Sequence, residues 1–157
     1  ELPNLEGLTN ILAENRDYKE IVKQNVMDNL DVITAGPKPP NPSELLGSRR
    51  MENFLELAKK EYDTIIIDTP PILAVTDSAI LSPLVDGVVI VAAYVQVTFD
   101  DAGHAKALLE RVNAKILGVI LNRIPLSQAG GHYYYYYEED SPTIDSTKSK
   151  RKPGIGA

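Results

Sequence analysis

Hydrophobic positions along this chain follow two periods in turn, one typical of strands and one of helices. Four short apolar runs, most of them rich in β-branched residues, have the character of buried strands, over 29–35, 65–68, 88–93 and 115–121. Between them, apolar residues recur every three or four positions, which predicts helices over about 5–15, 42–46, 48–62, 77–84 and 98–112. This alternation on short connections predicts an α/β fold with a mostly parallel sheet and helices on both faces.

Polar residues at the starts of these helices refine the prediction. Asn41 precedes Pro42 and fits a helix cap, with the proline at the first helical position. Thr76 and Thr98 are cap-type residues at the starts of two later helices. The four prolines within 36–42 exclude regular structure there, so we expect a rigid surface loop.

One predicted strand ends in a candidate functional residue. The isoleucines at 65–67 lead directly to Asp68, and Pro70 and Pro71 prevent the strand from continuing. Ligands of open parallel sheets bind at the carboxyl ends of the strands, where P-loop ATPases place a Walker B aspartate that orders Mg²⁺. Taken alone, such a run is more often a strand that ends at a polar turn residue, so the rest of the chain has to decide.

Composition and charge narrow the function classes. A chain of 157 residues with 43% hydrophobic content fits one globular domain and a tail. The absence of cysteine excludes disulfides and thiolate chemistry, and His104 and His132 are too isolated to suggest a metal cage. The net charge of -6 argues against nucleic acid as a partner.

The character of the chain changes after Pro125. A Gly130-Gly131 pair is followed by five consecutive tyrosines and then by mostly Ser, Thr, Asp, Lys and Pro. This composition predicts a disordered tail, so we divide the chain into a domain at 1–126 and a flexible tail at 127–157. Four acidic and four basic residues of the tail cancel, which leaves the net charge of -6 on the domain.

Six motifs occur in an order that resembles one family: the proline-rich loop at 39–46, the segment 62–71, Thr76-Asp77, the turn at 86–87, the run 117–123 and the tyrosine cluster. Together they resemble the catalytic domain of the bacterial tyrosine kinases that regulate capsular and exopolysaccharide synthesis. The strand ending at Asp68 is shared with plasmid-partition and septum-positioning ATPases of the same deviant Walker superfamily of P-loop NTPases. The proline-rich loop and the tyrosines distinguish the kinases.

The resemblance implies an ATP-dependent protein-tyrosine kinase with ATP and Mg²⁺ as cofactors. Asp68 matches the Walker B aspartate and would hold Mg²⁺, directly or through water. Asn122 matches the position where the superfamily places an amide against the adenine edge, although an ordinary strand-ending residue explains it about equally well. Thr69 and Pro70, with Pro71, would shape the loop that responds to the γ-phosphate.

The resemblance also implies acceptors and partners. The acceptors would be hydroxyls in a neighbouring subunit's tail, at Tyr133, Tyr134, Tyr135, Tyr136 and Tyr137. The implied partners are further copies of the kinase, a membrane activator or adaptor of polysaccharide synthesis and a cognate tyrosine phosphatase. Such a kinase would be cytoplasmic and held at the membrane by a partner or a fused segment.

One departure from the family pattern limits the prediction. The chain has no Gly-rich run ending in Gly-Lys-Ser or Gly-Lys-Thr, and Gly47-Ser48 lacks the lysine. The family carries that Walker A loop, and a second acidic motif, before the region matching 5–12. We therefore expect the C-terminal part of a kinase domain, inactive alone. A partition-type ATPase and a non-catalytic regulatory module of the same fold remain as alternatives, and a Gly-Lys-Ser/Thr loop upstream in the gene would favour the kinase.

Overall fold

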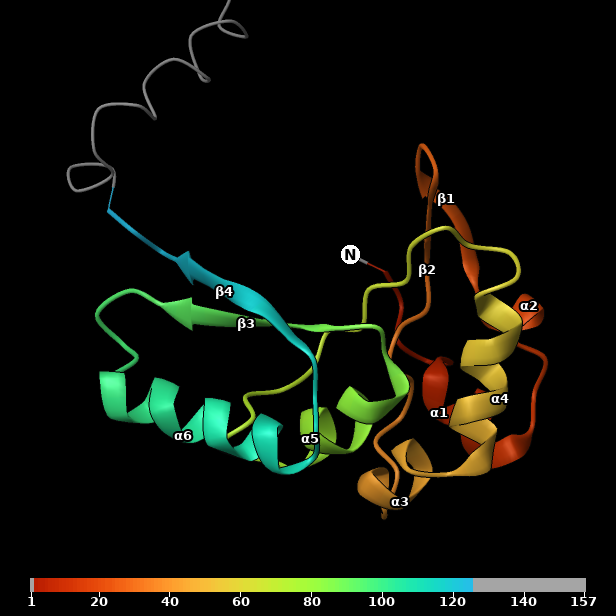
Figure 1. Ribbon diagram of the computed structural model, residues 1–157. Helices are drawn as coiled ribbons and strands as arrows, with labels where there is room; N and C mark the ends of the chain where they lie inside the picture. Colours follow the sequence, from red (N-terminus) through yellow and green to blue (C-terminus); the bar gives the residue numbers. More distant parts are fainter. Residues whose placement is uncertain (1, 126–157) are drawn as a thin grey trace, which may run out of the picture. The chain divides into compact units, whose positions relative to one another are not determined.

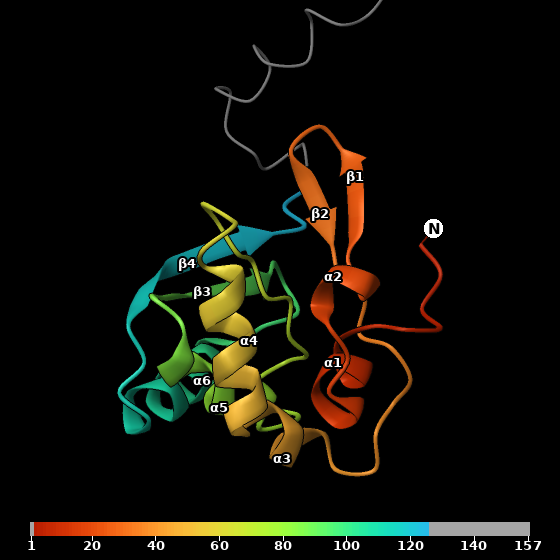
Figure 2. The ribbon, with the colours of Figure 1, turned by 90° about the vertical axis from the view of Figure 1, so that its right-hand side faces the viewer.

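The computed structural model describes residues 2–125, and the account below concerns the first unit of the chain, Glu1–Asn122. Its helices are α1 (Leu8–Glu14), α2 (Tyr18–Ile21), α3 (Pro42–Leu46), α4 (Arg49–Ala58), α5 (Asp77–Leu81), the 3-10 helix η1 (Ser82–Leu84) and α6 (Phe99–Arg111) (Figures 1 and 2). Its strands are β1 (Lys23–Met27), β2 (Leu30–Val32), β3 (Val88–Ala93) and β4 (Ile116–Asn122). The predicted tail at 127–157 lies outside the described residues.

The strands form two separate pairs. β3 and β4 are parallel, with a register that runs from Val88 opposite Ile116 to Ala93 opposite Asn122. Helix α6 connects them and lies along one side of the pair (Figure 1). β1 and β2 form an antiparallel hairpin. The sequence predicted β3 correctly and β4 to within one residue, but it missed β1, whose sequence KQNVM is mostly polar.

The predicted strand at 65–68 is wrong for this structure. Residues 64–71 are in neither a helix nor a strand, and Ile66 is 88% exposed. The β-branched run favours extended backbone, but a strand exists only when a neighbour completes its hydrogen-bond ladder. Among residues 2–125, no strand pairs with this segment.

Asn41, Thr76 and Thr98 all occupy the predicted N-cap positions, but only Thr98 makes the capping hydrogen bond with its side chain. Thr98 caps α6 as expected: its hydroxyl accepts from the Asp101 N–H at 3.1 Å, and the Asp101 carboxylate accepts from the Thr98 N–H at 3.0 Å. Asn41 and Thr76 make no such bond to the backbone. Their backbone lies outside the extended region that lets a cap side chain reach back to the first amides, with Thr76 at φ -88°, ψ -3°.

The main core lies among the helices. Its buried residues come from α1, α2, α4 and α5: Ile11, Leu12, Tyr18, Ile21, Met51, Leu55 and Leu81. A smaller buried set belongs to β3 and α6, with Ala92, Ala105 and Leu109. The other face of the β3–β4 pair is open among the described residues, because the register partners Val91 and Ile120 are 61% and 54% exposed.

Polar contacts fix α1 to the segment that leads into the proline-rich loop. The first amides of α1, on Leu8 and Thr9, donate to the carbonyls of Thr34 and Ala35 at 2.8 and 3.0 Å. The side chain of Asn10 accepts from the Gly7 N–H at 2.9 Å and donates to Glu14 at 3.0 Å. These bonds satisfy helix-end donors that would otherwise be unpaired.

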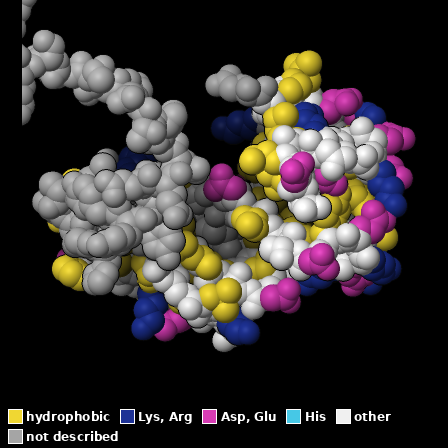
Figure 3. Space-filling view, turned by 90° about the horizontal axis from the view of Figure 1, so that it is seen from above, with side chains coloured by type: hydrophobic (Ala, Val, Ile, Leu, Met, Phe, Trp, Pro, Cys, Tyr) yellow, Lys and Arg dark blue, Asp and Glu magenta, His cyan; other side chains and the backbone are white. Residues whose placement is uncertain are grey.

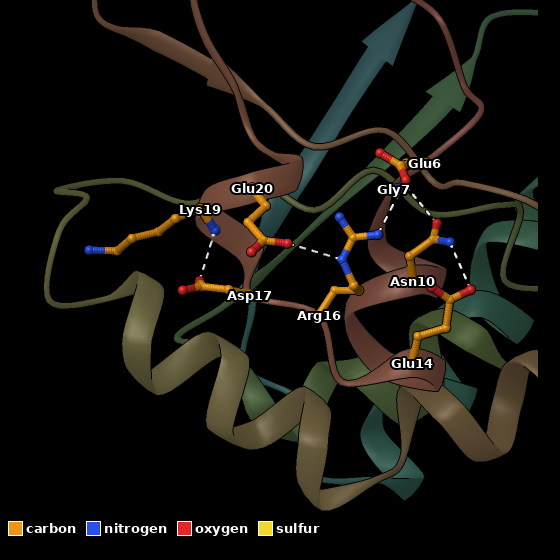
Figure 4. A network of polar contacts seen from close by, with 8 residues as sticks. All are labelled: Glu6, Gly7, Asn10, Glu14, Arg16, Asp17, Lys19 and Glu20. Carbon is orange, nitrogen blue, oxygen red and sulfur yellow. Dashed lines mark hydrogen bonds and ion pairs between the residues drawn. The ribbon is translucent and has the colours of Figure 1, made fainter.

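Arg16 extends this network from the loop after α1. Its guanidinium pairs with Glu6 at 3.3 Å and with Glu20 at 3.0 Å, so it ties the segment before α1 to α2 (Figure 4). Both carboxylates raise the pKa of Arg16. All three side chains are solvent-accessible, so we expect each ion pair to add little stability.

Candidate functional site

A slot of about 510 Å³ lies between residues 65–67, which we call the isoleucine segment, and the β3–β4 pair. We use "the slot" for the cavity whose two long walls are 64–67 and 86–89. β3 pairs with β4 on one edge, and no strand among the described residues pairs with its other edge. The slot is therefore flanked by two extended segments that share no ladder.

Ser78 contributes an unsatisfied polar group to the slot. Its hydroxyl oxygen is buried and has no hydrogen-bond partner among the described residues. A buried hydroxyl without a partner costs about 1–3 kcal/mol, so such groups normally find one. The slot is thus suited to a segment that brings its own donors or acceptors.

Asp68 lies at the end of the isoleucine segment and is exposed. Ile67 and Thr69 line the slot, whereas Asp68 and Pro70 do not. The Asp68 side chain is therefore not part of the wall of the slot. Within residues 2–125, the Asp68 carboxylate forms no hydrogen bond or ion pair, which leaves its oxygens available to a ligand.

A single free carboxylate fits a Mg²⁺ role but not a protein-built metal cage. Among the described residues, no three acidic or histidine side chains are grouped closely enough to hold a metal ion. Magnesium usually takes one or two carboxylates from the protein and fills its other positions with water and substrate phosphates. Asp68 can therefore serve as a Mg²⁺ ligand only together with a bound nucleotide.

Asn122 is the last residue of β4 and lies at the carboxyl end of the parallel pair. Its carbonyl accepts a hydrogen bond from the Tyr94 N–H at 2.8 Å, which fixes the backbone at this position. Asn122 is exposed and is not among the residues that line the slot. The sharing of one nucleotide site by Asn122 and Asp68 stays a prediction, and the five tyrosines at 133–137 lie outside the described residues.

Sequence reasoning missed a hydrogen bond between a tyrosine hydroxyl and a carboxylate, which joins the stretch just before the isoleucine segment to the β1–β2 hairpin. The Tyr62 hydroxyl donates to the Asp31 carboxylate at 2.7 Å, and Asp31 also accepts from the Asn25 N–H at 2.8 Å. The bond to Asp31, together with partial burial, raises the pKa of Tyr62 to about 12. The same bond lowers the pKa of Asp31. No local pattern of residues indicates this pair, because the two residues are 31 positions apart.

The charged side chains are spread over the surface. In Figure 3, acidic and basic side chains are interspersed along the rim of the described residues, with hydrophobic side chains between them. None of the helices between residues 2 and 125 has the length and apolar character of a membrane span.

The comparisons with known proteins identify the family. The profile of the AAA domain family matches residues 4–117, which include both walls of the slot and Asp68, and the chain belongs to this family. The similar curated proteins include bacterial tyrosine-protein kinases, and the similar solved structures include tyrosine kinase domains.

Three of these similarities show how much of each protein is shared. Tyrosine-protein kinase YwqD of Bacillus subtilis (strain 168) is 41% identical over 127 residues, 81% of this chain and 54% of YwqD. Tyrosine-protein kinase CpsD of Streptococcus agalactiae is 38% identical over 125 residues, 80% of this chain and 55% of CpsD. The kinase domain of the Escherichia coli tyrosine kinase ETK matches with a TM-score of 0.75 and 32% identity, over 94% of this chain and 53% of that domain. The chain thus spans about half the length of each.

Proposed function

We propose that this chain is part of an ATP-dependent protein-tyrosine kinase that regulates capsular or exopolysaccharide synthesis and export. The observation that carries the proposal is the 38–41% identity to tyrosine-protein kinases across a region that includes Asp68. The free, exposed carboxylate of Asp68 supports the proposal, because a Walker B aspartate must be available to a metal ion.

In the whole protein, a further strand fills the slot and brings the phosphate-binding loop beside Asp68. Three features support this: the two extended segments without a shared ladder, the unpaired Ser78 hydroxyl, and the 88% exposure of Ile66. A strand inserted between 64–67 and β3 would pair with both and cover Ile66. The shared length agrees, because nearly half of each relative lies outside the match.

The roles of the site residues follow from this arrangement. Bound Mg²⁺ would neutralise charge on the phosphates during transfer. Asp68 would hold the ion, Thr69 and Pro70 would shape the loop around the γ-phosphate, and Asn122 would bond the adenine edge with its amide. The tyrosines at 133–137 of a neighbouring subunit would accept the phosphoryl group.

The polysaccharide role implies partners at the membrane. The kinase would work as a homo-oligomer in the cytoplasm, next to a membrane activator or adaptor that is fused or separate. A cognate tyrosine phosphatase would reverse the modification. The net charge of -6 argues against nucleic acid as a main partner.

An isosteric substitution tests the function. In the full-length protein, Asp68→Asn should reduce tyrosine phosphorylation by roughly a hundredfold or more, because the amide cannot neutralise the metal. Asp63→Asn is the matched control, since Asp63 is also exposed and precedes the isoleucine segment. Both variants should keep the wild-type melting temperature. Full activity in Asp68→Asn would refute the proposal, and ATP hydrolysis without tyrosine phosphorylation would favour the positioning-ATPase alternative.

A further inference from the structure

Helices α3 and α5 meet through a short chain of side-chain oxygens. The Ser43 hydroxyl oxygen lies 3.3 Å from the Thr76 hydroxyl and 3.4 Å from one carboxylate oxygen of Asp77. An ionised carboxylate only accepts, so Ser43 must donate to Asp77 and can then accept from Thr76. This order uses the one proton of each hydroxyl and links the proline-rich loop to the first residues of α5.

Apolar packing supports the same junction. A methyl group added at Gly47, just after α3, would lie 3.4 Å from a methyl carbon of Ile80 in α5, an ordinary contact distance. Leu45 and Leu46 of α3 pack against the core that contains Leu81 of α5. The two helices therefore lie close together beside the same core and are joined by the polar chain through Ser43.

Helix α3 is itself held firmly at its start. Pro42 is at its first position and has a fixed φ. The side chain of Asn41 donates to the Glu44 carboxylate at 2.6 Å across the first turn. Ser43 lies on this first turn of α3, so its own position is fixed and it can anchor another segment.

The segment anchored by Ser43 is the one that follows Asp68. Residues 69–76 join Asp68 to α5 and include Pro70 and Pro71. Within the segment, only a turn is closed, by the N–H groups of Ala74 and Val75 bonding to the Pro71 carbonyl at 2.9 and 3.3 Å. Leu73 and Val75 are 48% and 40% exposed, so packing alone holds this segment weakly. The prolines and the closed turn limit the backbone freedom of the segment. A displacement of Thr76 would therefore also displace Asp68.

We infer that Ser43 is a positioning residue: through Thr76 and Asp77 it holds the loop that sets where the Asp68 carboxylate lies. This inference rests on the proposed role of Asp68 in binding Mg²⁺. According to this inference, the proline-rich loop holds segment 69–76, which follows Asp68, in a fixed position. Residues that orient a metal ligand typically change metal affinity or activity by 10–100-fold when they are replaced.

The test compares Ser43→Ala, Ser43→Thr and Ser48→Ala in the full-length kinase. Ser43→Ala should raise the Mg²⁺ concentration for half-maximal phosphorylation by about tenfold, while the melting temperature changes little. Ser43→Thr keeps a hydroxyl and should restore most of the wild-type Mg²⁺ dependence. Ser48→Ala is the matched control, because the Ser48 hydroxyl donates to the Leu45 carbonyl at 2.7 Å and forms no bond to α5.

Hydrogen exchange gives a readout that does not depend on activity. The amides of Ala74 and Val75, which are hydrogen-bonded in this segment, should exchange several-fold faster in Ser43→Ala than in wild type, with no change in β3. An unchanged Mg²⁺ dependence or unchanged exchange in Ser43→Ala would overturn the inference, as would an equal effect of Ser48→Ala. If Asp68→Asn retains activity, the proposed function fails, and faster exchange of Ala74 and Val75 would then support the anchor alone.

Discussion

Tyr62 and Tyr18 show that the surroundings of a tyrosine hydroxyl determine how much it contributes to the stability of the fold. The Tyr62 hydroxyl donates to Asp31, whereas the hydroxyl of buried Tyr18 has no partner within hydrogen-bond geometry among the described residues. The Tyr18 ring still packs edge-on against Phe54, with the centroids 5.7 Å apart. The same substitution should therefore reduce stability more at Tyr62 than at Tyr18.

We predict that Tyr62→Phe lowers the free energy of unfolding by about 1 kcal/mol, because one hydrogen bond is lost. Tyr18→Phe should lower it by less, since Glu61 is near the Tyr18 hydroxyl but outside hydrogen-bond geometry, and the ring contact is kept. Urea unfolding of the two variants and the wild type measures both values. Equal losses would mean that the ring environment, and not the bond to Asp31, controls stability here.

The hydrogen bond between Tyr62 and Asp31 also predicts that the free energy of unfolding depends on pH. The pKa of Asp31 is lowered in the folded state, so its stabilisation is present above its ordinary pKa and is lost as the pH falls through the folded value. The pKa of Tyr62 is raised to about 12, so its contribution is present below about pH 10 and is lost as the pH rises toward 12. In Tyr62→Phe, unfolding should depend less on pH at both extremes. Urea midpoints at acidic, neutral and alkaline pH would show this.

At the scale of elements, Gly7 and Gly103 differ in why glycine matters: Gly7 is required by close packing, whereas Gly103 affects only the helix propensity of α6. An added methyl group at Gly7 would lie 2.0 Å from the Thr34 carbonyl oxygen and 2.3 Å from the Gly36 nitrogen. At Gly103 in α6, nothing lies within 4 Å of the same position. Gly7 therefore allows α1 to approach the segment before the proline-rich loop.

We predict that Gly7→Ala destabilises the protein by about 3 kcal/mol, because the contacts are with backbone atoms that cannot move aside. Gly103→Ala should stabilise it by about 0.5–1 kcal/mol, since alanine is the better helix former. Thermal unfolding followed by circular dichroism compares the two. A neutral Gly7→Ala variant would contradict the close approach of α1.

Elements whose own residues carry a strong apolar or capping pattern were predictable, and features that depend on contacts with other segments were not. β3 and the Thr98 cap of α6 follow from local apolar and polar pattern, and both were predicted correctly. The isoleucine segment has the composition of a strand, but no neighbour among the described residues completes a ladder with it. Asp68 could be proposed as a site residue because it directly follows that run. Ser43, Ser78 and Asp31 matter through contacts that no local pattern records.

At the scale of the whole molecule, the 157-residue chain should bind ATP weakly. The sequence has no Gly-rich run ending in Gly-Lys-Ser/Thr, and Asp68 and Asn122 would reach only the metal and the base edge. Titration calorimetry with Mg·ATP should show no binding at micromolar concentrations. Micromolar affinity would mean that other residues of this chain hold the phosphates.

Phosphorylation of the tail should loosen assembly of the full-length kinase. Each phosphate adds about -1.5 to -2 charges, and five adjacent tyrosines stand beside Glu138, Glu139 and Asp140 on a chain that already carries -6. The tail should then be repelled from a neighbour's site. Sedimentation before and after ATP, with phosphopeptide mapping, tests this. Label outside 133–137 would refute the acceptors, and an unchanged particle size would refute the release mechanism.

The open face of the β3–β4 pair also governs how this chain behaves as a solute. Val91 and Ile120 are exposed apolar residues beside a strand edge that has no partner within residues 2–125, which favours association of this face with other molecules. Mutual repulsion from the net charge of -6 keeps copies apart, but dissolved salt weakens that repulsion and strengthens apolar attraction. The purified chain should therefore be most soluble at low ionic strength and should precipitate readily when ammonium sulfate is added.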